Sequence, residues 1–364
     1  MSGERMNNWV VIYHTNCCDG LAAMLVAEAA HEFLTGASGD DSEFMSIPFQ
    51  YKWKLSQEQL DAMYNKDVFI LDFSFSPKDM EQIRAYAANV VMLDHHETAA
   101  DMWGGYRENV DPGVVTDIGE NPKEYRATLR FKLDKCRSGA TLAYQYFRGL
   151  CKGKGNWLSD EAKASFKIYH PNTWEMCRHA EDRDLFSYIL KDTRAWHMLL
   201  DKAARGKAEQ REELTALIYG PSQEFQTKLQ EKQVLVEDYL TRCKRYAYKA
   251  QPLTILGIKA CVLNVASDYT SDTAAFVYQV HPTDPVLCWV ASTEQVFVSV
   301  RSGPGAHVSA RTIAEYFGGG GHEQAAGFTL KPKQLPQLLD GSLKPTLLDF
   351  IKKQWKNFRE PKGY

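Results

Sequence analysis

Acidic and imidazole side chains recur at three places in the first hundred residues, each where a short apolar run ends. Carboxylates and imidazoles together suit hard or borderline divalent cations, and Mn²⁺ more naturally than Zn²⁺ because carboxylates outnumber thiolates here. Two such cations can hold a hydroxide between them and stabilise the leaving oxygen when a phosphate ester or anhydride is hydrolysed. The residues are His14, Asp19, Asp72, Asp94, His95 and His96.

Each of these residues also has a structural explanation. Asp is a favoured helix N-cap, and two adjacent histidines can form a surface turn. All three groups together are harder to explain in this way, because buried carboxylates repel one another unless cations lie between them. We therefore prefer the metal-binding interpretation.

The elements that must position these residues follow a pattern typical of a parallel α/β domain. Apolar runs at 9–14, 44–51, 68–73 and 90–93 predict strands, and they alternate with segments of helical spacing. The runs are apolar throughout, as expected when helices cover both faces of a sheet. Ligands bind beyond the carboxyl ends of parallel strands. We therefore expect the three groups to converge on one crevice.

The composition and the predicted elements change twice in the remainder of the chain. Residues 104–137 are rich in Gly, Asp, Pro and charge and predict an irregular excursion with one hairpin, whereas everything after Pro252 favours short strands. Helices are predicted at 20–34, 77–88, 138–147, 172–200 and 223–250, and strands at 253–256, 259–264, 286–291 and 295–300. A basic amphipathic segment with Lys352, Lys353, Lys356, Arg359 and Lys362 ends the chain.

The predicted fold class is α/β, with a parallel-sheet N-terminal domain, a helical connector and a smaller α+β C-terminal domain. At 364 residues, two domains are expected. We place the catalytic domain at 1–204, the connector at 205–250, the second domain at 251–335 and the tail at 336–364.

Composition excludes several classes of protein. The chain is 44% hydrophobic and 24% charged, which argues against disorder or a disulfide-stapled miniprotein. Its net charge of -3 argues against wrapping of duplex DNA. The eight cysteines contain no Cys-x-x-Cys pair, so a zinc ribbon is not expected. Without a secretory signal or a membrane-spanning apolar run, we expect a cytoplasmic protein with no membrane partner.

Six segments resemble the DHH phosphoesterases, a family named for Asp-His-His. Residues 93–97, Leu-Asp-His-His-Glu, resemble the signature itself. The family's other motifs are resembled by residues 13–20, 69–72 and 181–186, and the associated C-terminal domain of its nuclease-type branch by 298–302 and 318–328. The resemblance covers about 1–100, 138–190 and 250–330, and it is specific because motifs of both halves occur in order.

By position, the resemblance makes Asp72 the carboxylate that bridges two Mn²⁺ ions, with Mg²⁺ or Co²⁺ as alternatives. It places His96 at the scissile phosphate, while Asp94 would orient its neighbours or coordinate a cation. The other implied ligands are His14 for one cation and Asp19, His95 and Asp182 for the other.

The choice between Asp182 and Asp184 rests on one observation. The family's ligand is followed four residues on by an aromatic residue, and Phe186 stands four residues after Asp182. We therefore predict Asp182 as the ligand.

Cys17 departs from the family pattern, in which an Asp often stands two residues before the Asp of Asp-Gly. A thiolate ligand at this position would shift the metal preference. We expect instead a small buried thiol without a ligand role, because a lone thiolate among oxygen ligands is uncommon for Mn²⁺.

The glycine run at 318–321 leaves backbone N–H groups free to approach an anion, and His322 adds a donor, although glycine runs are also typical of flexible loops. Arg301 can make a bidentate contact with phosphate. The resemblance implies that this part of the chain closes over the substrate. The implied substrate-binding residues are Arg301, Ser302, Gly318, Gly319, Gly320, Gly321 and His322.

The resemblance implies a Mn²⁺-dependent phosphodiesterase or exonuclease of oligoribonuclease type. Its substrates would be short single-stranded nucleic acids or small linear or cyclic dinucleotides, cut to nucleoside monophosphates. One alternative is a phosphoanhydride hydrolase of exopolyphosphatase or pyrophosphatase type, against which the glycine motif counts. The other is a non-catalytic nucleotide-binding protein, which Cys17 favours and the retained ligand set opposes.

Overall fold

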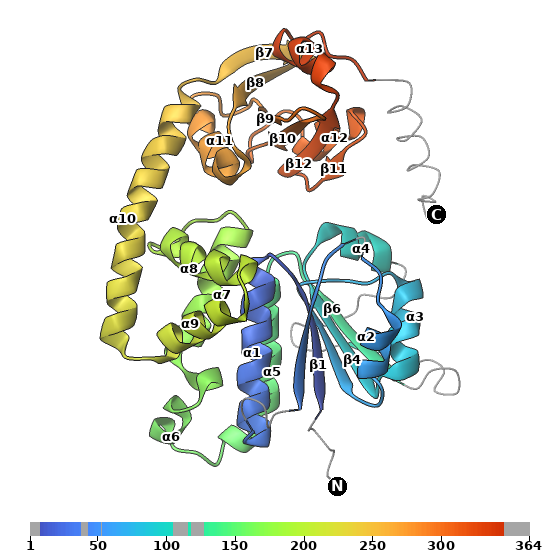
Figure 1. Cartoon of the computed structure of the whole chain (residues 1–364), viewed down its shortest axis with the longest axis vertical. Helices are drawn as coiled ribbons and strands as arrows, with labels where there is room; N and C mark the ends of the chain where they lie inside the picture. Colours follow the sequence, from blue (N-terminus) through green and yellow to red (C-terminus); the bar gives the residue numbers. More distant parts are fainter. Residues whose placement is uncertain (1–7, 38–42, 52, 105–115, 118–126, 346–364) are drawn as a thin grey trace. The chain divides into compact units, whose positions relative to one another are not determined.

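The computed structural model describes residues 8–37, 43–51, 53–104, 116–117 and 127–345. The chain divides into two compact units, the first ending at Val234 and the second beginning at Leu235. The boundary lies inside one long helix, α10 (Ser222–Ala247), which confirms the helix predicted at 223–250. Figure 1 shows the elements of each unit.

A six-stranded sheet with the order β2-β1-β3-β4-β6-β5 forms the centre of the first unit. Five of its strands are parallel, and β5 pairs antiparallel with β6. The predicted parallel sheet is thereby confirmed. The strands are β1 (Trp9–His14), β2 (Phe44–Phe49), β3 (Asp67–Leu71), β4 (Asn89–Asp94), β5 (Thr116–Asp117) and β6 (Thr128–Leu133).

Strand β6 corrects the prediction of a merely irregular excursion at 104–137. It forms the expected antiparallel pair with β5, but it also pairs with β4 as the fifth parallel strand. Its pattern differs from the apolar runs of the other strands because Leu129 and Phe131 are buried whereas Thr128 and Arg130 are exposed. A strand near the edge of a sheet needs only one apolar face.

Helices cover both faces of this sheet, as the apolar strands require. On one side lie α1 (Cys18–Thr35) and α5 (Gly139–Gly155), and on the other α2 (Gln57–Ala62), α3 (Pro77–Tyr86) and α4 (Glu97–Trp103), as Figure 1 shows. Alternate residues of β1 pack against the helices on the two faces of the sheet. Val10 belongs to the same buried cluster as Met80 of α3, whereas the Trp9 ring packs against Phe147 of α5.

The helical stretch predicted at 172–200 is two helices, α7 (Pro171–Asp184) and α8 (Thr193–Arg205). Phe186 and Tyr188, between them, have positive φ angles of 54° and 49°, which end the helix. The unit is completed by α6 (Asp160–Ala164), a 3₁₀ turn at Lys167–Tyr169 and α9 (Ala208–Tyr219).

The second unit is a mixed sheet with the order β11-β12-β10-β9-β8-β7, antiparallel except between β8 and β9. This confirms the predicted α+β character. The strands are β7 (Gln251–Ile255), β8 (Ile258–Asn264), β9 (Val286–Ala291), β10 (Val296–Arg301), β11 (Gly320–Gly321) and β12 (Ala325–Leu330). The helices are α11 (Thr270–Tyr278), α12 (Ala310–Tyr316) and α13 (Leu335–Leu339), with 3₁₀ turns at Ser267–Tyr269 and Pro332–Gln334.

The predicted amphipathic tail with Lys352, Lys353, Lys356, Arg359 and Lys362 lies outside the described residues. Within the described part of the chain, no helix combines the length and the apolar character needed to cross a membrane.

Candidate metal centre

Three neighbouring strands bring polar residues to one edge of the sheet, at or directly after their carboxyl ends. Tyr13 of β1 pairs with Leu71 of β3, which in turn pairs with Leu93 of β4. The next residues are His14, Asp72 and Asp94, so these three form a row at the carboxyl edge of the sheet. His14 and Asp94 are the last residues of β1 and β4, and Asp72 directly follows β3. The expected convergence at the strand carboxyl ends is present in the structure.

Asp72 occupies the middle of this row in an unusual backbone conformation. Its φ angle is 54°, and its N–H donates to the carbonyl of Leu93 at 2.9 Å. A positive φ costs energy for a residue other than glycine, and such strain gathers at functional sites. The side chain is completely buried. The turn thus directs a carboxylate into the interior at the point where the strands end.

Asp19 reaches the same place from the first turn of α1. Its carboxylate accepts the N–H groups of Gly139 at 2.6 Å and Ala140 at 3.1 Å, at the start of α5. Free N–H groups at a helix start favour a negative charge. Gly20 is required beside it, because a Cβ there would lie 2.2 Å from the carbonyl oxygen of His14.

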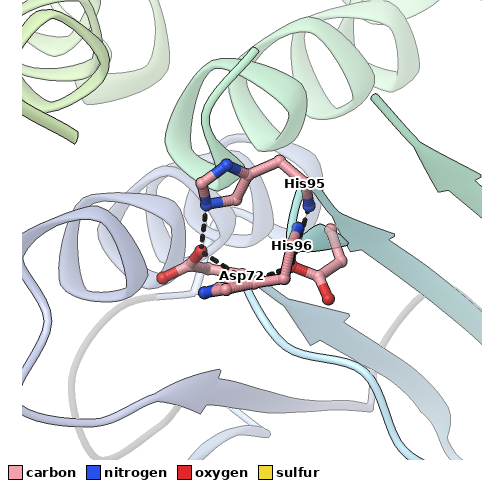
Figure 2. A group of neighbouring side chains, drawn as sticks. Asp72, His95 and His96 are labelled. Atoms are coloured by element: carbon pink, nitrogen blue, oxygen red, sulfur yellow. Dashed lines mark hydrogen bonds and ion pairs between the residues drawn. The ribbon is translucent and has the colours of Figure 1, made fainter. Parts of the chain in front are cut away.

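His95 and His96 differ in what they contact (Figure 2). The Nε2 atom of His95 lies 3.2 Å from Asp72 Oδ1 and 3.8 Å from Asp19 Oδ2. His96 turns its Nδ1 to Asp94 Oδ1 at 2.6 Å. Asp94 is completely buried and also accepts the Ser74 hydroxyl at 2.6 Å. Asp94 therefore orients His96, as one of its two predicted roles requires.

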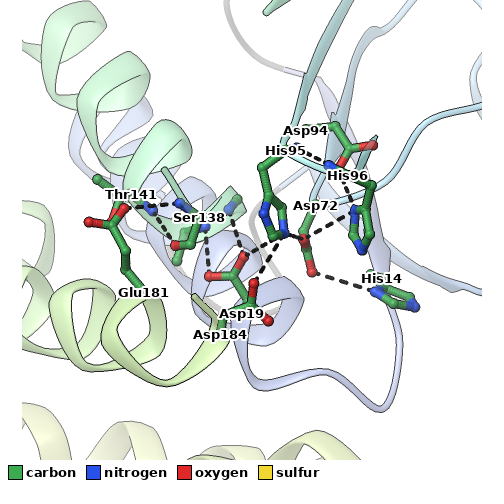
Figure 3. A network of polar contacts seen from close by, with 12 residues as sticks. His14, Asp19, Asp72, Asp94, His95, His96, Ser138, Thr141, Glu181 and Asp184 are labelled. Carbon is green, nitrogen blue, oxygen red and sulfur yellow. Dashed lines mark hydrogen bonds and ion pairs between the residues drawn. The ribbon is translucent and has the colours of Figure 1, made fainter. Parts of the chain in front are cut away.

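The structure favours Asp184 over the predicted Asp182 as the aspartate of α7 at the cluster. Asp184 Oδ2 lies 3.3 Å from His95 Nε2, and Asp184, Asp19 and His95 each offer a ligand atom within 4.8 Å of the others (Figure 3). Residues two positions apart lie on opposite faces of a helix, so only one of the two aspartates of α7 can face the cluster. That residue is Asp184.

Asp182 has a structural role instead. Its buried carboxylate accepts the N–H groups of Ile189 at 2.8 Å and Leu190 at 3.1 Å, together with the hydroxyl of Thr193. These bonds tie the turn after α7 to the start of α8. The aromatic signal at Phe186 does not agree with this geometry, because the Asp182 carboxylate is occupied by these hydrogen bonds.

This division of roles predicts opposite phenotypes for two matched variants. Asp184→Asn should weaken metal binding and leave thermal stability almost unchanged. Asp182→Asn should retain the metal but destabilise the fold by about 2 kcal/mol, since charge-assisted hydrogen bonds of its carboxylate are lost. Elemental analysis and thermal unfolding of both variants distinguish the two roles. Loss of metal from Asp182→Asn with normal stability would restore the original assignment.

Burial and mutual repulsion govern the charges of the cluster. Burial, followed by the proximity of Asp72 and Asp184, raises the pKa of Asp19 well above its usual value. Although burial opposes it, the histidines His14, His95 and His96 hold the pKa of Asp72 below its usual range. Burial also acts against the histidines, yet the surrounding carboxylates raise the pKa of His95 to about 10. Protons thus balance these carboxylates where no cation does.

Unsatisfied atoms show that the cluster fits a cation. The two carboxylate oxygens of Asp72 and the Nδ1 atom of His14 are buried, and none of the three has a hydrogen-bond partner among the residues that the structure describes. His14 Nδ1 lies 3.6 Å from Asp72 Oδ2, too far for a good hydrogen bond. Buried polar atoms are nearly always satisfied. Carboxylate and imidazole groups that converge while some of their atoms lack a hydrogen bond suit divalent cations.

The predicted substrate-binding residues lie in the second unit, where Arg301 ends β10. Its guanidinium donates to the hydroxyl of Ser271 at 3.3 Å and to the carbonyl of Val300 at 3.0 Å. Ser302 is buried and does not suit substrate contact. Its hydroxyl accepts the Ala310 N–H and donates to the Glu323 carbonyl, both at 2.9 Å, so it organises the domain instead.

The glycine run is shaped by packing and is not a plain flexible loop. Gly318, with φ of 76°, follows α12 in the left-handed conformation that commonly ends a helix. A Cβ at Gly319 would lie 2.1 Å from the carbonyl oxygen of Gly327. Gly320 and Gly321 form strand β11, and exposed His322 starts the turn to β12. Of the predicted set, Arg301 and His322 keep side chains suited to phosphate.

Two residues that shape the candidate metal centre were not predicted from the sequence. Gly139 packs so closely on Asp72 that a Cβ would lie 2.5 Å from the Cβ of Asp72. Glu181 accepts the N–H of Ser138 at 2.9 Å and so positions the start of α5. No local signal marks Gly139 as special, since its role depends on a residue 67 positions away in the chain.

Comparisons with known proteins agree with this architecture. Residues 257–342 match the DHHA1 domain family. An uncharacterised protein of Acanthamoeba polyphaga mimivirus is 25% identical over 187 residues, which are 50% of this chain and 35% of that protein. The chain thus spans about a third of the length of this curated relative.

Two solved structures share the fold. A DHH domain described as belonging to a member of a family of ribosomal proteins is 14% identical with a TM-score of 0.57, over 96% of this chain and 87% of that one. RecJ from Thermus thermophilus, in complex with Mn²⁺, is 15% identical with a TM-score of 0.52, over 98% of this chain and 53% of that one.

Proposed function

We propose that this chain, a DHH-family phosphoesterase in its two-unit architecture with a DHHA1 domain at 257–342, hydrolyses phosphodiester bonds with the help of divalent cations. The observation that carries the proposal is the buried Asp72 carboxylate. Its two oxygens have no hydrogen-bond partner among the described residues, and imidazole groups of His14 and His95 lie 3.6 and 3.2 Å from them.

Two groups of donors adjoin Asp72. One consists of His14, Cys17 and Asp72 itself, whose ligand atoms all lie within 4.8 Å of one another, and the other of Asp19, His95 and Asp184. His95 Nε2 lies 3.2 Å from Asp72 Oδ1, so Asp72 adjoins both groups. We infer that Asp72 bridges two cations, with Mn²⁺ preferred overall.

Bound cations would supply an activated water and neutralise charge on the phosphate oxygens. The chain's own residues hold and orient the reactants. Asp94 Oδ1 fixes one side of the His96 ring through Nδ1 at 2.6 Å. Although burial opposes it, Asp94 raises the pKa of His96 to about 9, so the doubly protonated ring can also donate a hydrogen bond to the scissile phosphate from Nε2. Asp94 acts through His96 and is a positioning residue.

The proposed substrates are short single-stranded oligonucleotides and small dinucleotides, cut to nucleoside monophosphates. Two features support small substrates: the net charge of -3, which gives little attraction to a long polyanion, and the DHHA1 domain, where Arg301 and His322 offer donors for a further phosphate.

A substrate panel tests the proposal. The full chain is stripped with a chelator, reloaded with Mn²⁺, Mg²⁺ or Co²⁺, and incubated with dinucleotides, short oligonucleotides, cyclic dinucleotides, a bis-aryl phosphodiester, pyrophosphate and polyphosphate. We expect no hydrolysis by the stripped protein and the fastest reloaded reaction with oligonucleotides or dinucleotides. Arg301→Ala should lower kcat/KM for a dinucleotide more than for the bis-aryl ester, which has no second phosphate.

Other outcomes would replace the proposal. Hydrolysis of pyrophosphate or polyphosphate alone would identify a phosphoanhydride hydrolase. Binding of nucleotides by the metal-loaded chain without any turnover would identify a non-catalytic nucleotide-binding protein. An equal loss on both esters in Arg301→Ala would mean that Arg301 supports the fold of the second unit.

A further inference from the structure

Cys17 lies where the β1 strand passes into α1, at the N-cap position of the helix. Its side chain makes no capping hydrogen bond, so helix formation does not explain the residue. The sulfur instead lies close to His14 and Asp72, with one ligand atom of each residue within 4.8 Å of the others. A thiol, an imidazole and a carboxylate therefore meet at one point.

The two neighbours of this sulfur need a partner. His14 Nδ1 and the Asp72 oxygens are buried, and none has a hydrogen-bond partner within the described parts of the chain. A small apolar thiol packed beside them would leave these atoms unsatisfied, at a cost in stability. A cation held by all three side chains would satisfy them together.

We propose that Cys17 is a ligand of one of the two cations, binding as a thiolate together with His14 and Asp72. The inference deepens the proposed function and rests on it. It reverses the expectation from sequence that Cys17 has no ligand role. That expectation assumed that a thiolate at this position would be surrounded by oxygen ligands. In the structure, the group that contains Cys17 combines a thiol, an imidazole and a carboxylate.

This assignment makes the two subsites chemically unequal. Thiolate and imidazole favour Zn²⁺, Co²⁺ or Fe²⁺, whereas the group formed by Asp19, His95 and Asp184 is richer in oxygen and suits Mn²⁺ or Mg²⁺. The loaded enzyme should therefore hold two different metals when both kinds are offered. A carboxylate at position 17 would remove the difference.

The adjacent cysteine provides a matched control. Cys18 Sγ lies 3.3 Å from Nδ1 of His197 on α8, so its sulfur has a different neighbour from that of Cys17. Substituting either cysteine by serine removes one sulfur from the same turn of chain.

The test is a Co²⁺ titration of the chelator-stripped full chain, read by optical absorption without substrate. A thiolate bound to Co²⁺ gives a charge-transfer band in the near ultraviolet, whereas d–d bands report Co²⁺ with any ligand set. We expect the charge-transfer band in the wild type and in Cys18→Ser, and its absence in Cys17→Ser and Cys17→Asp. X-ray absorption of the Zn²⁺-loaded wild type should show a metal–sulfur distance of about 2.3 Å.

Affinity gives a second readout. Loss of a residue that only supports a metal ligand typically lowers metal affinity by ~10–100-fold. Cys17→Ser removes a ligand itself, so it should lower the metal affinity of one subsite by more than this. Cys17→Asp should retain two metals per chain but shift the preference of that subsite from Zn²⁺ toward Mn²⁺.

Each contrary result has a distinct meaning. A charge-transfer band that survives in Cys17→Ser and disappears in Cys18→Ser would assign the sulfur ligand to Cys18 and overturn the proposal. Co²⁺ bound with d–d bands but no charge-transfer band in the wild type would overturn the role of Cys17 and leave the proposed function standing. Failure of the wild type to bind Co²⁺, Zn²⁺ or Mn²⁺ would overturn both.

Discussion

Replacement of Asp72 by asparagine is expected to lower turnover by at least about 1,000-fold, which corresponds to a rise of ~4 kcal/mol in activation free energy. Asp72 adjoins both groups of candidate ligands, because its carboxylate lies 3.6 Å from His14 and 3.2 Å from His95. An amide has one neutral oxygen acceptor in place of two charged ones. It cannot hold two cations at catalytic separation.

Asparagine is the appropriate substitute because of the backbone at this position. Asp72 has φ of 54°, a conformation that asparagine adopts more readily than most residues, whereas alanine would add strain of about 1 kcal/mol. Asp72→Asn therefore removes the charge with little change in the fold.

The measurement combines metal content, circular dichroism and turnover after removal and restoration of Mn²⁺. The matched control is Asp61→Asn, which changes an exposed aspartate of α2 and should have no effect. Near-normal turnover by Asp72→Asn with restored Mn²⁺ would overturn the two-cation centre.

Gly139→Ala is the second change with a large expected effect, and its sign is opposite to what helix propensity predicts. Alanine in a helix is more favourable than glycine by about 1 kcal/mol. At Gly139, however, the added Cβ would lie 2.5 Å from Asp72 Cβ, 2.8 Å from Asp72 Cα and 3.0 Å from Asp19 Oδ2. Both the backbone and the carboxylates of the centre would have to move.

We expect kcat to fall by about 100-fold, the effect of a displacement of about 1 Å at a reacting centre. Metal affinity should fall as well, because Asp19 and Asp72 are both displaced. The controls are Gly149→Ala and Gly153→Ala in the same helix, where an added Cβ meets nothing within 4 Å. These variants should raise stability and leave activity unchanged. If Gly139→Ala behaves like them, the close packing of α5 on Asp72 has no role in catalysis.

The sequence alone determined the parallel sheet of the first unit and the convergence of its strand ends. Apolar strands that alternate with helices leave few other folds, and parallel strands all deliver their carboxyl ends to one edge. His14, Asp72, Asp94 and His95 could therefore be placed together without coordinates. Four strands of the second unit, β7 to β10, were also predicted from short apolar runs between turns, whereas β11 and β12 were not.

Only the tertiary structure decided the roles of residues that depend on how a helix is rotated or on how closely distant parts of the backbone approach. Asp182 and Asp184 are two positions apart, and the packing of α7 against α1, α5 and α8 sets which of them faces the cluster. The need for glycine at position 139 comes from Asp72, far away in the chain. Cys17 has a small apolar side chain in sequence terms, and its proposed role as a metal donor depends on its place beside buried atoms of His14 and Asp72 that lack hydrogen bonds. Such roles follow from which groups a side chain meets, and local sequence does not specify those neighbours.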